Sequence, residues 1–322
     1  MERSIAPRLV SVAVPTRNRP DTLRLALQSI RALEGPDLKF EILVGDNGDM
    51  PETKTVAEEF GGVYVRASDG CGPGRNAGMR IATGDYIAFL DDDDVFLPGN
   101  IRPHLAMLDA HPELDAVVGQ LIKTDPNLEN HSASQPEKDP GQGDALTRSL
   151  LGGFFPQMGT TVARASVIKK DGLFDESLVY GQDLDWQLRI ARRGAMGYTP
   201  TPCILFRGRA SGTYDNMALK RVQFDRRVFL RHALPEWRLW SSPIAFFKAY
   251  TRNIEFFYWY FAHVAGEYLN RGDNQKAAAA VGGALYVFPL RGMVHLIMRP
   301  HFRRALLAGL FRRQADKAPA RS

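Results

Sequence analysis

The stretch GRNAGMRIATGDYIAFLDDDDVFLP, residues 74–98, joins a helix signal, a strand signal and a run of four carboxylates. Residues 75–84 indicate a short helix. Residues 86–91 form a continuous apolar run, which is typical of a strand covered by helices on both sheet faces. Asp91–Asp94 follow directly at the end of that strand. Since adjacent carboxylates repel one another, a cation is expected to balance them.

The same alternation of strands and helices extends through the first 120 residues. Strand signals lie at 9–16, 40–46, 63–67, 86–91 and 115–123, and helix signals lie at 21–33, 51–60 and 75–84. This order predicts an α/β fold, a Rossmann-like and mostly parallel sheet flanked by helices. Ligands of such sheets bind outside the carboxyl ends of the strands, so these ends are the first place to look for a site.

The later sequence is less regular. Residues 124–144 are rich in polar, Pro and Gly residues and predict a long loop, either disordered or a flap. Residues 159–172 indicate a strand and a short helix, and 181–194 an amphipathic helix that ends at Gly194. Residues 198–209 predict an extended segment that returns to the sheet. From about Met217 the chain becomes helical, aromatic and basic.

Composition favours an ordinary globular protein of a reducing compartment. The 322 residues are 44% hydrophobic and 24% charged. The two cysteines, Cys71 and Cys203, lie far apart, so they form no CxxC pair and no disulfide framework. The N-terminus has no apolar run before a cleavage site, which argues against a signal peptide and favours a cytoplasmic location.

The net charge of +5 is concentrated at the C-terminus. From Arg291 to the end there are eight Lys or Arg residues and one acid, Asp316, so this tail carries +7 and the rest of the chain −2. A uniformly basic protein would suggest a nucleic-acid partner. A basic tail on a near-neutral body predicts a local electrostatic anchor instead, and no nucleic-acid partner.

The aspartate run suggests a metal site. In extended backbone Asp91 and Asp93 face the same way, and two hard oxygen ligands suit Mg²⁺ or Mn²⁺. Asp92 and Asp94 would face the other way, where they could contact a ribose hydroxyl or cap the turn. The alternative is an acidic, solvated turn that caps a helix from about Pro98.

Other strand ends favour a nucleotide ligand. Thr16, Arg17, Asn18 and Arg19 follow the first strand at a helix entrance, where backbone N–H groups attract anions. Asp46 follows the second strand and could accept a hydrogen bond from a uracil-like or guanine-like base. Turn formation alone would also explain these residues.

A glycine-rich segment adds a further nucleotide signal. GCGPGRNAG, residues 70–78, runs into a helix and offers Arg75 as a cation for a ribose, base or phosphate. It resembles a phosphate cradle, but it has neither the GxxxxGK[ST] pattern nor a dinucleotide GxGxxG pattern. A solvated arginine is the alternative role of Arg75.

Taken in order, four segments resemble family 2 inverting glycosyltransferases, which have the GT-A fold. They are VAVPTRNRP (12–20), ILVGDNGD (42–49), GRNAGMRIATGDYIAFLDDDDVFLP (74–98) and GQDLDWQLR (181–189). The resemblance covers about residues 8–215, and its most specific part is the third segment. It implies a nucleotide-diphosphate sugar as donor, with a UDP-sugar expected, and Mn²⁺ or Mg²⁺ as cofactor.

The resemblance also implies roles for individual residues. The turn with Pro15, Thr16 and Asn18, together with Asp46, would hold the nucleotide base and ribose, with Arg75 beside the base. Asp91 and Asp93 occupy the DxD positions for ribose and metal, and Asp183 occupies the position of the catalytic base. The donor-binding residues expected from sequence and resemblance together are Pro15, Thr16, Asn18, Arg19, Asp46, Arg75, Asp91, Asp92 and Arg209.

Sugar transfer fits these residues chemically. Charge builds on the leaving phosphate, where a metal stabilises it, and the acceptor hydroxyl must lose a proton, which Asp183 can take. A single displacement inverts the anomeric centre and needs no nucleophilic residue.

Two departures from the family pattern stand out. Gln182 replaces the usual Glu beside the base, which raises the prospect that Asp185 shares the task. Where relatives carry a histidine, this chain has Arg207 and Arg209, which could pair with the departing diphosphate or be a surface pair.

The C-terminal third suggests membrane contact. Residues 277–290 are uncharged but too short to span a bilayer, and 291–314 interleave apolar residues with arginines. We therefore expect a GT-A catalytic domain at 1–215, with donor binding at about 8–123 and the acceptor side at about 145–215. Residues 216–322 would lie on an anionic membrane surface, peripheral to the inner face, or form a bundle with a solvated tail.

The acceptor would then be a saccharide or a lipid-linked saccharide, which the sequence does not name, and it does not name the donor sugar either. Two other functions stay open. A nucleotidyltransferase would need a Gly-rich, Lys-containing first loop, unlike PTRNRP (15–20). A catalytically impaired relative that acts as a membrane-associated interaction module is suggested only by Gln182.

Overall fold

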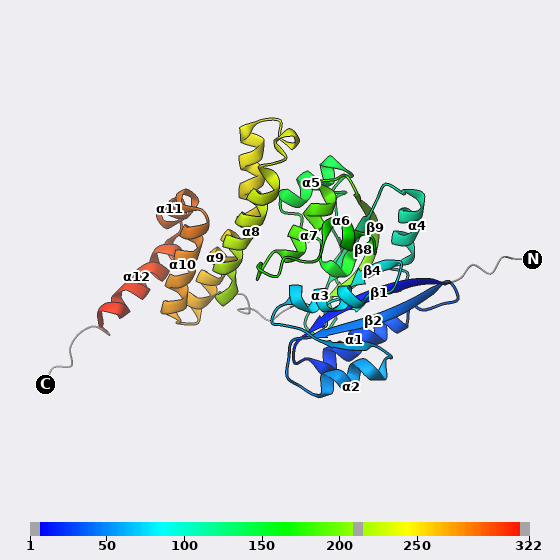
Figure 1. The fold of residues 1–322 in the computed structure, drawn as a ribbon. Coiled ribbons are helices and arrows are strands. Elements are labelled where there is room, and N and C mark those ends of the chain that lie inside the picture. The colour runs from blue at the N-terminus through cyan, green and yellow to red at the C-terminus, as the bar shows by residue number, and fades with distance from the viewer. Residues whose placement is uncertain (1–6, 209–214, 316–322) are drawn as a thin grey trace, which may run out of the picture. The chain divides into compact units, whose positions relative to one another are not determined.

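The computed structural model describes residues 7–208 and 215–315, and the chain divides into two units (Figure 1). Unit 1 comprises Met1–Ala210 and Leu230–Ser241, and unit 2 comprises Ser211–Phe229 and Ser242–Ser322. Unit 1 contains the sheet, and the described part of unit 2 is helical.

The first unit alternates strands and helices, as predicted. The strands are β1 (Arg8–Thr16), β2 (Leu38–Asp46), β3 (Val63–Arg66), β4 (Tyr86–Phe89), β5 (Val95–Phe96), β6 (Ala116–Lys123), β7 (Ser134–Gln135), β8 (Thr161–Arg164) and β9 (Met196–Phe206). The helices are α1 (Pro20–Arg31), α2 (Glu52–Glu59), α3 (Cys71–Ile81), α4 (Arg102–Ala110), α5 (Asp144–Leu151), α6 (Val167–Asp171) and α7 (Gln182–Ala191), with 3₁₀ turns η1 (Met158–Thr160) and η2 (Trp237–Leu239). The predicted α/β class is confirmed.

Within the described residues the strands form one nine-stranded sheet in the order β3-β2-β1-β4-β8-β6-β9-β5, with β7 paired to β6. The four strands β3, β2, β1 and β4 are parallel, as the sequence predicts. β8 is antiparallel to both β4 and β6, and β5 is antiparallel to β9, while β6 and β9 are parallel. The second half of the sheet is therefore mixed, which strand signals alone do not reveal.

Helices cover both faces of the sheet around β1. Val10, Val12 and Val14 are fully buried in one cluster with Leu23 and Leu27 of α1. On the other face, Gly78 of α3 lies so close that a Cβ added there would be 3.2 Å from the Cβ of Ala13. Because successive side chains alternate between two covered faces, the strand is apolar throughout.

The strand register brings the polar strand ends together. Thr16 of β1 pairs with Asp46 of β2, and Asp46 pairs with Arg66 of β3. On the other side of β1, the backbone N–H of Leu90 donates to the carbonyl of Ala13 over 3.2 Å, just before the aspartate run. The carboxyl ends of these strands thus meet at one edge of the sheet.

The structure refines two sequence predictions. The predicted loop at 124–144 contains the two-residue strand β7, which pairs with Leu121 and Ile122 of β6. The helix expected from about Pro98 begins at Arg102, and its N-cap residue Ile101 makes no side-chain cap hydrogen bond. The aspartate run therefore does not cap α4.

The second unit is built from long helices: α8 (Asp215–Ala233, whose last residues belong to unit 1), α9 (Pro243–Asn270), α10 (Asn274–Val287), α11 (Pro289–Met298) and α12 (Pro300–Ala315). Its core combines Tyr258 and Phe261 of α9 with Val281 of α10 and Phe302 of α12. Caps define two helix starts, since Ser242 accepts from the N–H of Ala245 and Asp273 from that of Lys276. Among the helices of the described residues, none has the length and apolar character that crossing a bilayer requires.

Candidate active site

The aspartate run is a turn, not the extended segment expected from its sequence. The N–H of Asp94 donates to the carbonyl of Asp91 over 3.1 Å. This turn brings carboxylate oxygens of Asp91, Asp93 and Asp94 within 4.8 Å of one another, with Asp94 buried and the other two partly buried. Hard oxygen ligands at such short separations fit a divalent cation such as Mn²⁺ or Mg²⁺. Asp94 joins the predicted pair Asp91 and Asp93, and sequence reasoning missed it because it assumed alternating faces.

Asp92 is not part of this group, and its carboxylate contacts the end of β1 and the residues that follow it. Its Oδ2 accepts from the Thr16 hydroxyl over 2.7 Å, and its Oδ1 accepts from the Arg19 guanidinium over 3.2 Å. Burial raises the pKa of Asp92 to about 6, although the Thr16 hydrogen bond and the Arg19 charge oppose this rise. Asp92 therefore ties the turn to the β1–α1 loop.

Arg19 bridges two of the four aspartates. Besides Asp92, it donates to Asp93 Oδ2 over 2.9 Å, and about half of its side chain remains exposed. Part of the negative charge of the run is thus balanced by the protein itself.

Arg75 lies on the first turns of α3, with its side chain nearly buried. Its Nη2 donates to Asp91 Oδ1 over 2.6 Å, and its guanidinium lies 5.6 Å from the ring centroid of Phe174. Burial alone would lower its pKa, but the negative charges of Asp91 and Asp183 raise the pKa above its usual value. Its Nε and Nη1 are buried without a hydrogen-bond partner among the described residues. Two of its nitrogen donors are therefore not used by the protein.

Glycines allow α3 to lie this close to the sheet. A Cβ at Gly74 would lie 2.9 Å from the Cβ of Pro15, and one at Gly45 would lie 2.0 Å from the carbonyl oxygen of Gly74. The segment that resembles a phosphate cradle thus contributes the first turns of α3, and Gly74 and Gly78 serve close helix–sheet packing.

Two predicted donor-binding residues already have protein partners. Asp46 is fully buried and accepts from the N–H of Gly48 over 2.7 Å and from the Tyr64 hydroxyl over 3.0 Å. Asn18, with φ of 55°, donates to Asp49 Oδ1 over 2.7 Å and accepts from the Asp49 N–H over 2.8 Å. The side chain of Asn18 thus joins the loops after β1 and β2.

The start of α7 presents the predicted base. Asp183 is partly buried, its Oδ1 accepts from the N–H of Leu184 over 2.9 Å, and its charge acts on Arg75. Gln182 beside it is buried against Gly72, and its Oε1 has no hydrogen-bond partner in the described part of the chain. Asp183 therefore lies close enough to Arg75 for the two charges to interact.

Asp185, the other carboxylate of this helix, is held by three cations or potential cations. His232 lies 2.9 Å from it, Arg231 2.8 Å and Arg189 3.2 Å, and its side chain is 1% exposed. These partners lower the pKa of Asp185 against the opposing effect of burial, the largest single influence. The carboxylate acts as a structural junction.

Arg207 braces the aspartate turn from the end of β9. Its Nε donates to the carbonyl of Asp93 and its Nη1 to that of Pro126, each over 2.7 Å. Its backbone N–H donates to Asp94 Oδ1 over 2.9 Å. The sequence singled out Arg207, but as a diphosphate partner. Arg209, the predicted donor-binding residue, lies outside the described residues.

Comparisons with known proteins identify the family. The family model for glycosyl transferase family 2 matches residues 11–171. An uncharacterised glycosyltransferase of Rickettsia prowazekii is 29% identical over 236 residues, which cover 69% of this chain and 71% of that protein. Alignments with three further curated relatives span 61% to 64% of their own lengths.

Solved structures show the same fold. S. aureus TarS 1–349 in complex with UDP-GlcNAc matches with a TM-score of 0.55 at 15% identity, over 96% of this chain and 92% of that one. The mannosyltransferase PcManGT from Pyrobaculum calidifontis, in complex with GDP-Man and Mn²⁺, matches with a TM-score of 0.54 at 18% identity, over 98% and 89%. At such identities the likeness establishes the fold.

Proposed function

The chain belongs to glycosyltransferase family 2, and on that premise we propose that it transfers a sugar from a nucleotide-diphosphate sugar to a hydroxyl acceptor, with inversion at the anomeric carbon. The proposed donor is a UDP-sugar, and the proposed acceptor is a saccharide or a lipid-linked saccharide. One observation carries the proposal. The carboxylates of Asp91, Asp93 and Asp94 converge at the sheet edge, next to an arginine on which the charge of Asp183 acts.

The donor would lie along the carboxyl edge of β1, β2 and β4. Pro15, Thr16 and Asp46 stand at that edge, and Arg75 has two unused donors for a base, ribose or phosphate oxygen. Arg19 joins Asp92 to Asp93 and remains half exposed, so it can also reach an anionic donor. Nucleotide sugars named for TarS and PcManGT support this class of donor.

Asp91, Asp93 and Asp94 would hold Mn²⁺ or Mg²⁺, because their oxygens form a compact hard donor set. When bound, such an ion neutralises the charge that develops on the leaving diphosphate. Arg207 holds the turn that presents these carboxylates. Arg209 follows this brace by two residues, and we propose it for the departing diphosphate.

Asp183 is the proposed general base. Its Oδ1 already accepts from a helix N–H, so its Oδ2 would take the proton of the acceptor hydroxyl as that oxygen attacks the anomeric carbon. Asp185 is less suited, since Arg189, Arg231 and His232 surround it. The buried Oε1 of Gln182 could accept a hydrogen bond from a sugar hydroxyl but cannot act as a base.

A panel of nucleotide sugars tests the donor proposal. The unfolding midpoint is measured with each donor in the presence of Mn²⁺, followed by donor hydrolysis for those that bind. One UDP-sugar is expected to raise the midpoint, because a ligand that binds only the folded state stabilises it by mass action. UDP alone serves as control for the sugar's contribution. If no nucleotide sugar binds or is turned over by the folded chain, the proposal fails and the impaired-relative alternative gains.

For location, we propose a cytoplasmic protein that is peripheral to the inner face of the cell membrane. The catalytic domain would end near residue 215, and residues 216–322 would provide the attachment. The basic composition of that region supports this proposal.

A further inference from the structure

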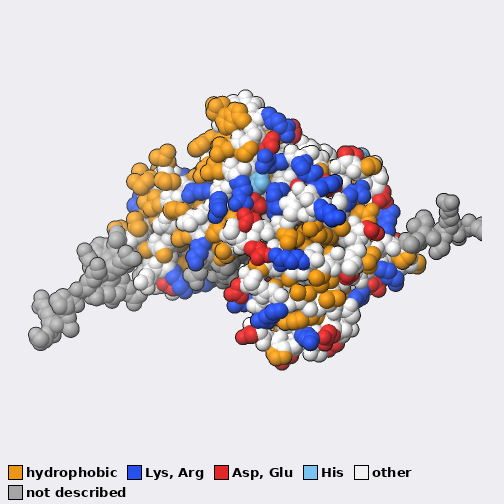
Figure 2. Space-filling view, in the orientation of Figure 1, with side chains coloured by type: hydrophobic (Ala, Val, Ile, Leu, Met, Phe, Trp, Pro, Cys, Tyr) orange, Lys and Arg blue, Asp and Glu red, His pale blue; other side chains and the backbone are white. Residues whose placement is uncertain are grey.

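Helix α11 exposes its apolar face. Its exposed large apolar side chains, each between 54% and 86% accessible, are Leu290, Met293, Val294, Ile297 and Met298. Their spacing of three, four, seven and eight residues from Leu290 places them on one helix face. Figure 2 shows hydrophobic side chains gathered at the surface over this part of the chain. In a helix packed on a core, such a stripe ordinarily faces inward.

The polar and small residues of α11 face the rest of unit 2. His295 lies with its Nδ1 2.5 Å from the Tyr258 hydroxyl, and Arg291 donates to Glu255 over 2.7 Å. A Cβ at Gly292 would lie 2.8 Å from Leu285 of α10, so that side of the helix is in close contact. The helix is therefore anchored through its polar side, and the outward direction of the stripe is fixed by named contacts.

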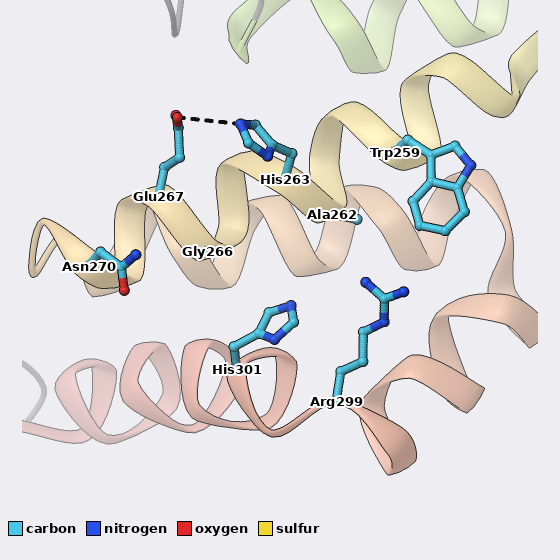
Figure 3. Close-up of a pocket in the computed structure, with 8 residues that line it drawn as sticks. All are labelled: Trp259, Ala262, His263, Gly266, Glu267, Asn270, Arg299 and His301. Atoms are coloured by element: carbon cyan, nitrogen blue, oxygen red, sulfur yellow. Dashed lines mark ion pairs between the residues drawn. The ribbon is translucent and has the colours of Figure 1, made fainter.

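A cavity of about 530 Å³ lies beside the end of this stripe. Figure 3 shows Arg299 and His301, at the corner between α11 and α12, pointing toward one face of α9. Arg299 lies 5.7 Å from the ring centroid of Trp259, and Ala262 and Gly266 of α9 leave the space between them open.

The sequence from α10 to α12 is basic. Between residues 274 and 315 the sequence has seven Lys or Arg residues and no acid. The carboxylate that lines the cavity, Glu267, is paired with His263 over 3.4 Å and Arg271 over 3.8 Å. Glu267 thus already has basic partners, and Arg299 gives the cavity a positive group that favours an anionic ligand.

We propose that α11 and this cavity form a docking surface for an anionic phospholipid bilayer. The apolar stripe enters the interfacial region, and Arg299 and His301 contact a lipid phosphate in the cavity. A bilayer is the occupant that is both apolar and anionic, whereas a second copy of the same surface would bring further positive charge. The inference deepens the peripheral attachment proposed above and rests on it. It assigns that attachment to α11 and the cavity rather than to the terminal tail.

Vesicle co-sedimentation of the full chain tests the proposal. Phosphatidylcholine vesicles with and without phosphatidylglycerol are compared, and the anionic vesicles are expected to bind at least ten-fold more tightly. Replacing Leu290, Ile297 and Met298 together by Gln should lower binding to anionic vesicles at least ten-fold, since the stripe is exposed and the fold does not depend on it. The matched control replaces Leu25, Val63 and Ile81, exposed apolar residues of unit 1, by Gln.

A second pair of variants, one test and one control, examines the role of the cavity. A Cβ added at Gly266 meets no heavy atom within 4 Å, so Gly266→Leu can be accommodated, fills the cavity and should weaken binding several-fold. Gly282→Leu, at an equally open glycine of α10, should leave binding unchanged. Excess soluble glycerol phosphate should not release the protein from vesicles, since the stripe holds it there.

Other results would overturn the proposal. Equal binding of the stripe variant and the wild type to anionic vesicles would do so. Release by glycerol phosphate would identify a site for free phosphate instead, and a concentration-dependent rise in mass without vesicles, lost in the stripe variant, would identify a second copy. Donor hydrolysis measured without vesicles should be the same in the stripe variant and the wild type. Its absence in both would refute the proposed chemistry while leaving the vesicle result to stand alone.

Discussion

The side chain of Arg207 donates to the backbone carbonyl of Asp93 over 2.7 Å. Arg207 directly follows β9, so the end of this strand supports the turn that presents the carboxylates. Arg207→Lys would keep the backbone donor to Asp94 but lose the Nε contact and the geometry that also reaches Pro126. We expect the Mn²⁺ concentration for half-maximal donor hydrolysis to rise about ten-fold. Turnover at saturating Mn²⁺ should change much less.

The same variant gives a readout that is independent of activity. Thermal stabilisation by Mn²⁺ alone should need a correspondingly higher ion concentration in Arg207→Lys. An unchanged half-saturation value in both measurements would show that the brace does not position the carboxylates.

Metal removal should abolish turnover. EDTA is expected to stop donor hydrolysis in the wild type and added Mn²⁺ to restore it. Asp93→Asn should lower hydrolysis by about 100-fold or more even with excess Mn²⁺, because one anionic ligand is lost. The partly exposed position of Asp93 predicts an almost unchanged unfolding midpoint. Full activity in EDTA would contradict the metal assignment.

Replacement by Asn should lower turnover at Asp183 and lower stability at Asp185. Asp183→Asn is expected to lower turnover by about 100-fold or more at an unchanged unfolding midpoint, since it removes the proposed base. Asp185→Asn should reduce the free energy of unfolding by about 3 kcal/mol, because it leaves Arg189, Arg231 and His232 without their buried anion. Donor hydrolysis kinetics and urea unfolding of both variants distinguish the catalytic role from the structural one. Loss of turnover in a stable Asp185→Asn protein would move the base to that residue.

His104 of α4 should make the stability of the fold depend on pH. The ring is fully buried with its Nε2 3.2 Å from the Thr160 carbonyl, and burial lowers the pKa of His104 from 6.5 to about 4. As pH falls through this window the unfolded chain gains a proton that the folded chain does not, so the stability present above pH 6.5 is lost. The expected loss between pH 7 and pH 5 is about 2 kcal/mol.

The control for this prediction is His104→Gln, which keeps an amide donor for Thr160 but does not titrate. Urea unfolding of both proteins at pH 7 and pH 5 gives the difference. If the variant loses as much stability as the wild type on acidification, another group is responsible.

Much of the donor-binding half could be predicted from local patterns. The strand at 86–91 is apolar because both of its faces are covered. Thr16 and Asp46 end two neighbouring apolar runs of the sequence, and the register of β1 with β2 places them side by side. The apolar strand depends on contacts that the period of the sequence already specifies. Asp183 is predicted instead from the resemblance to family 2 glycosyltransferases, in which the base stands before an amphipathic helix.

Non-local contacts account for what the sequence did not show. The turn at Asp91–Asp94 lies between β4 and β5, and β5 pairs with β9, so its shape depends on a strand more than a hundred residues later. The contacts of Arg207 with Asp93 and Asp94 are equally distant in sequence, so local patterns did not predict its bracing role. For α11, the apolar spacing was present in the sequence, but its outward direction depends on partners in α9, Glu255 and Tyr258.

The brace between Asp94 and Arg207 joins atoms 113 positions apart in the chain. During synthesis the four aspartates are therefore made well before Arg207, which supports their turn. A nascent chain that ends before β9 would therefore contain the four aspartates but not the turn that groups their carboxylates. We expect binding of the divalent cation only after β9 has joined the sheet. Early synthesis of the acidic run would thus not imply early binding of the proposed metal, because the sheet would have to be completed first.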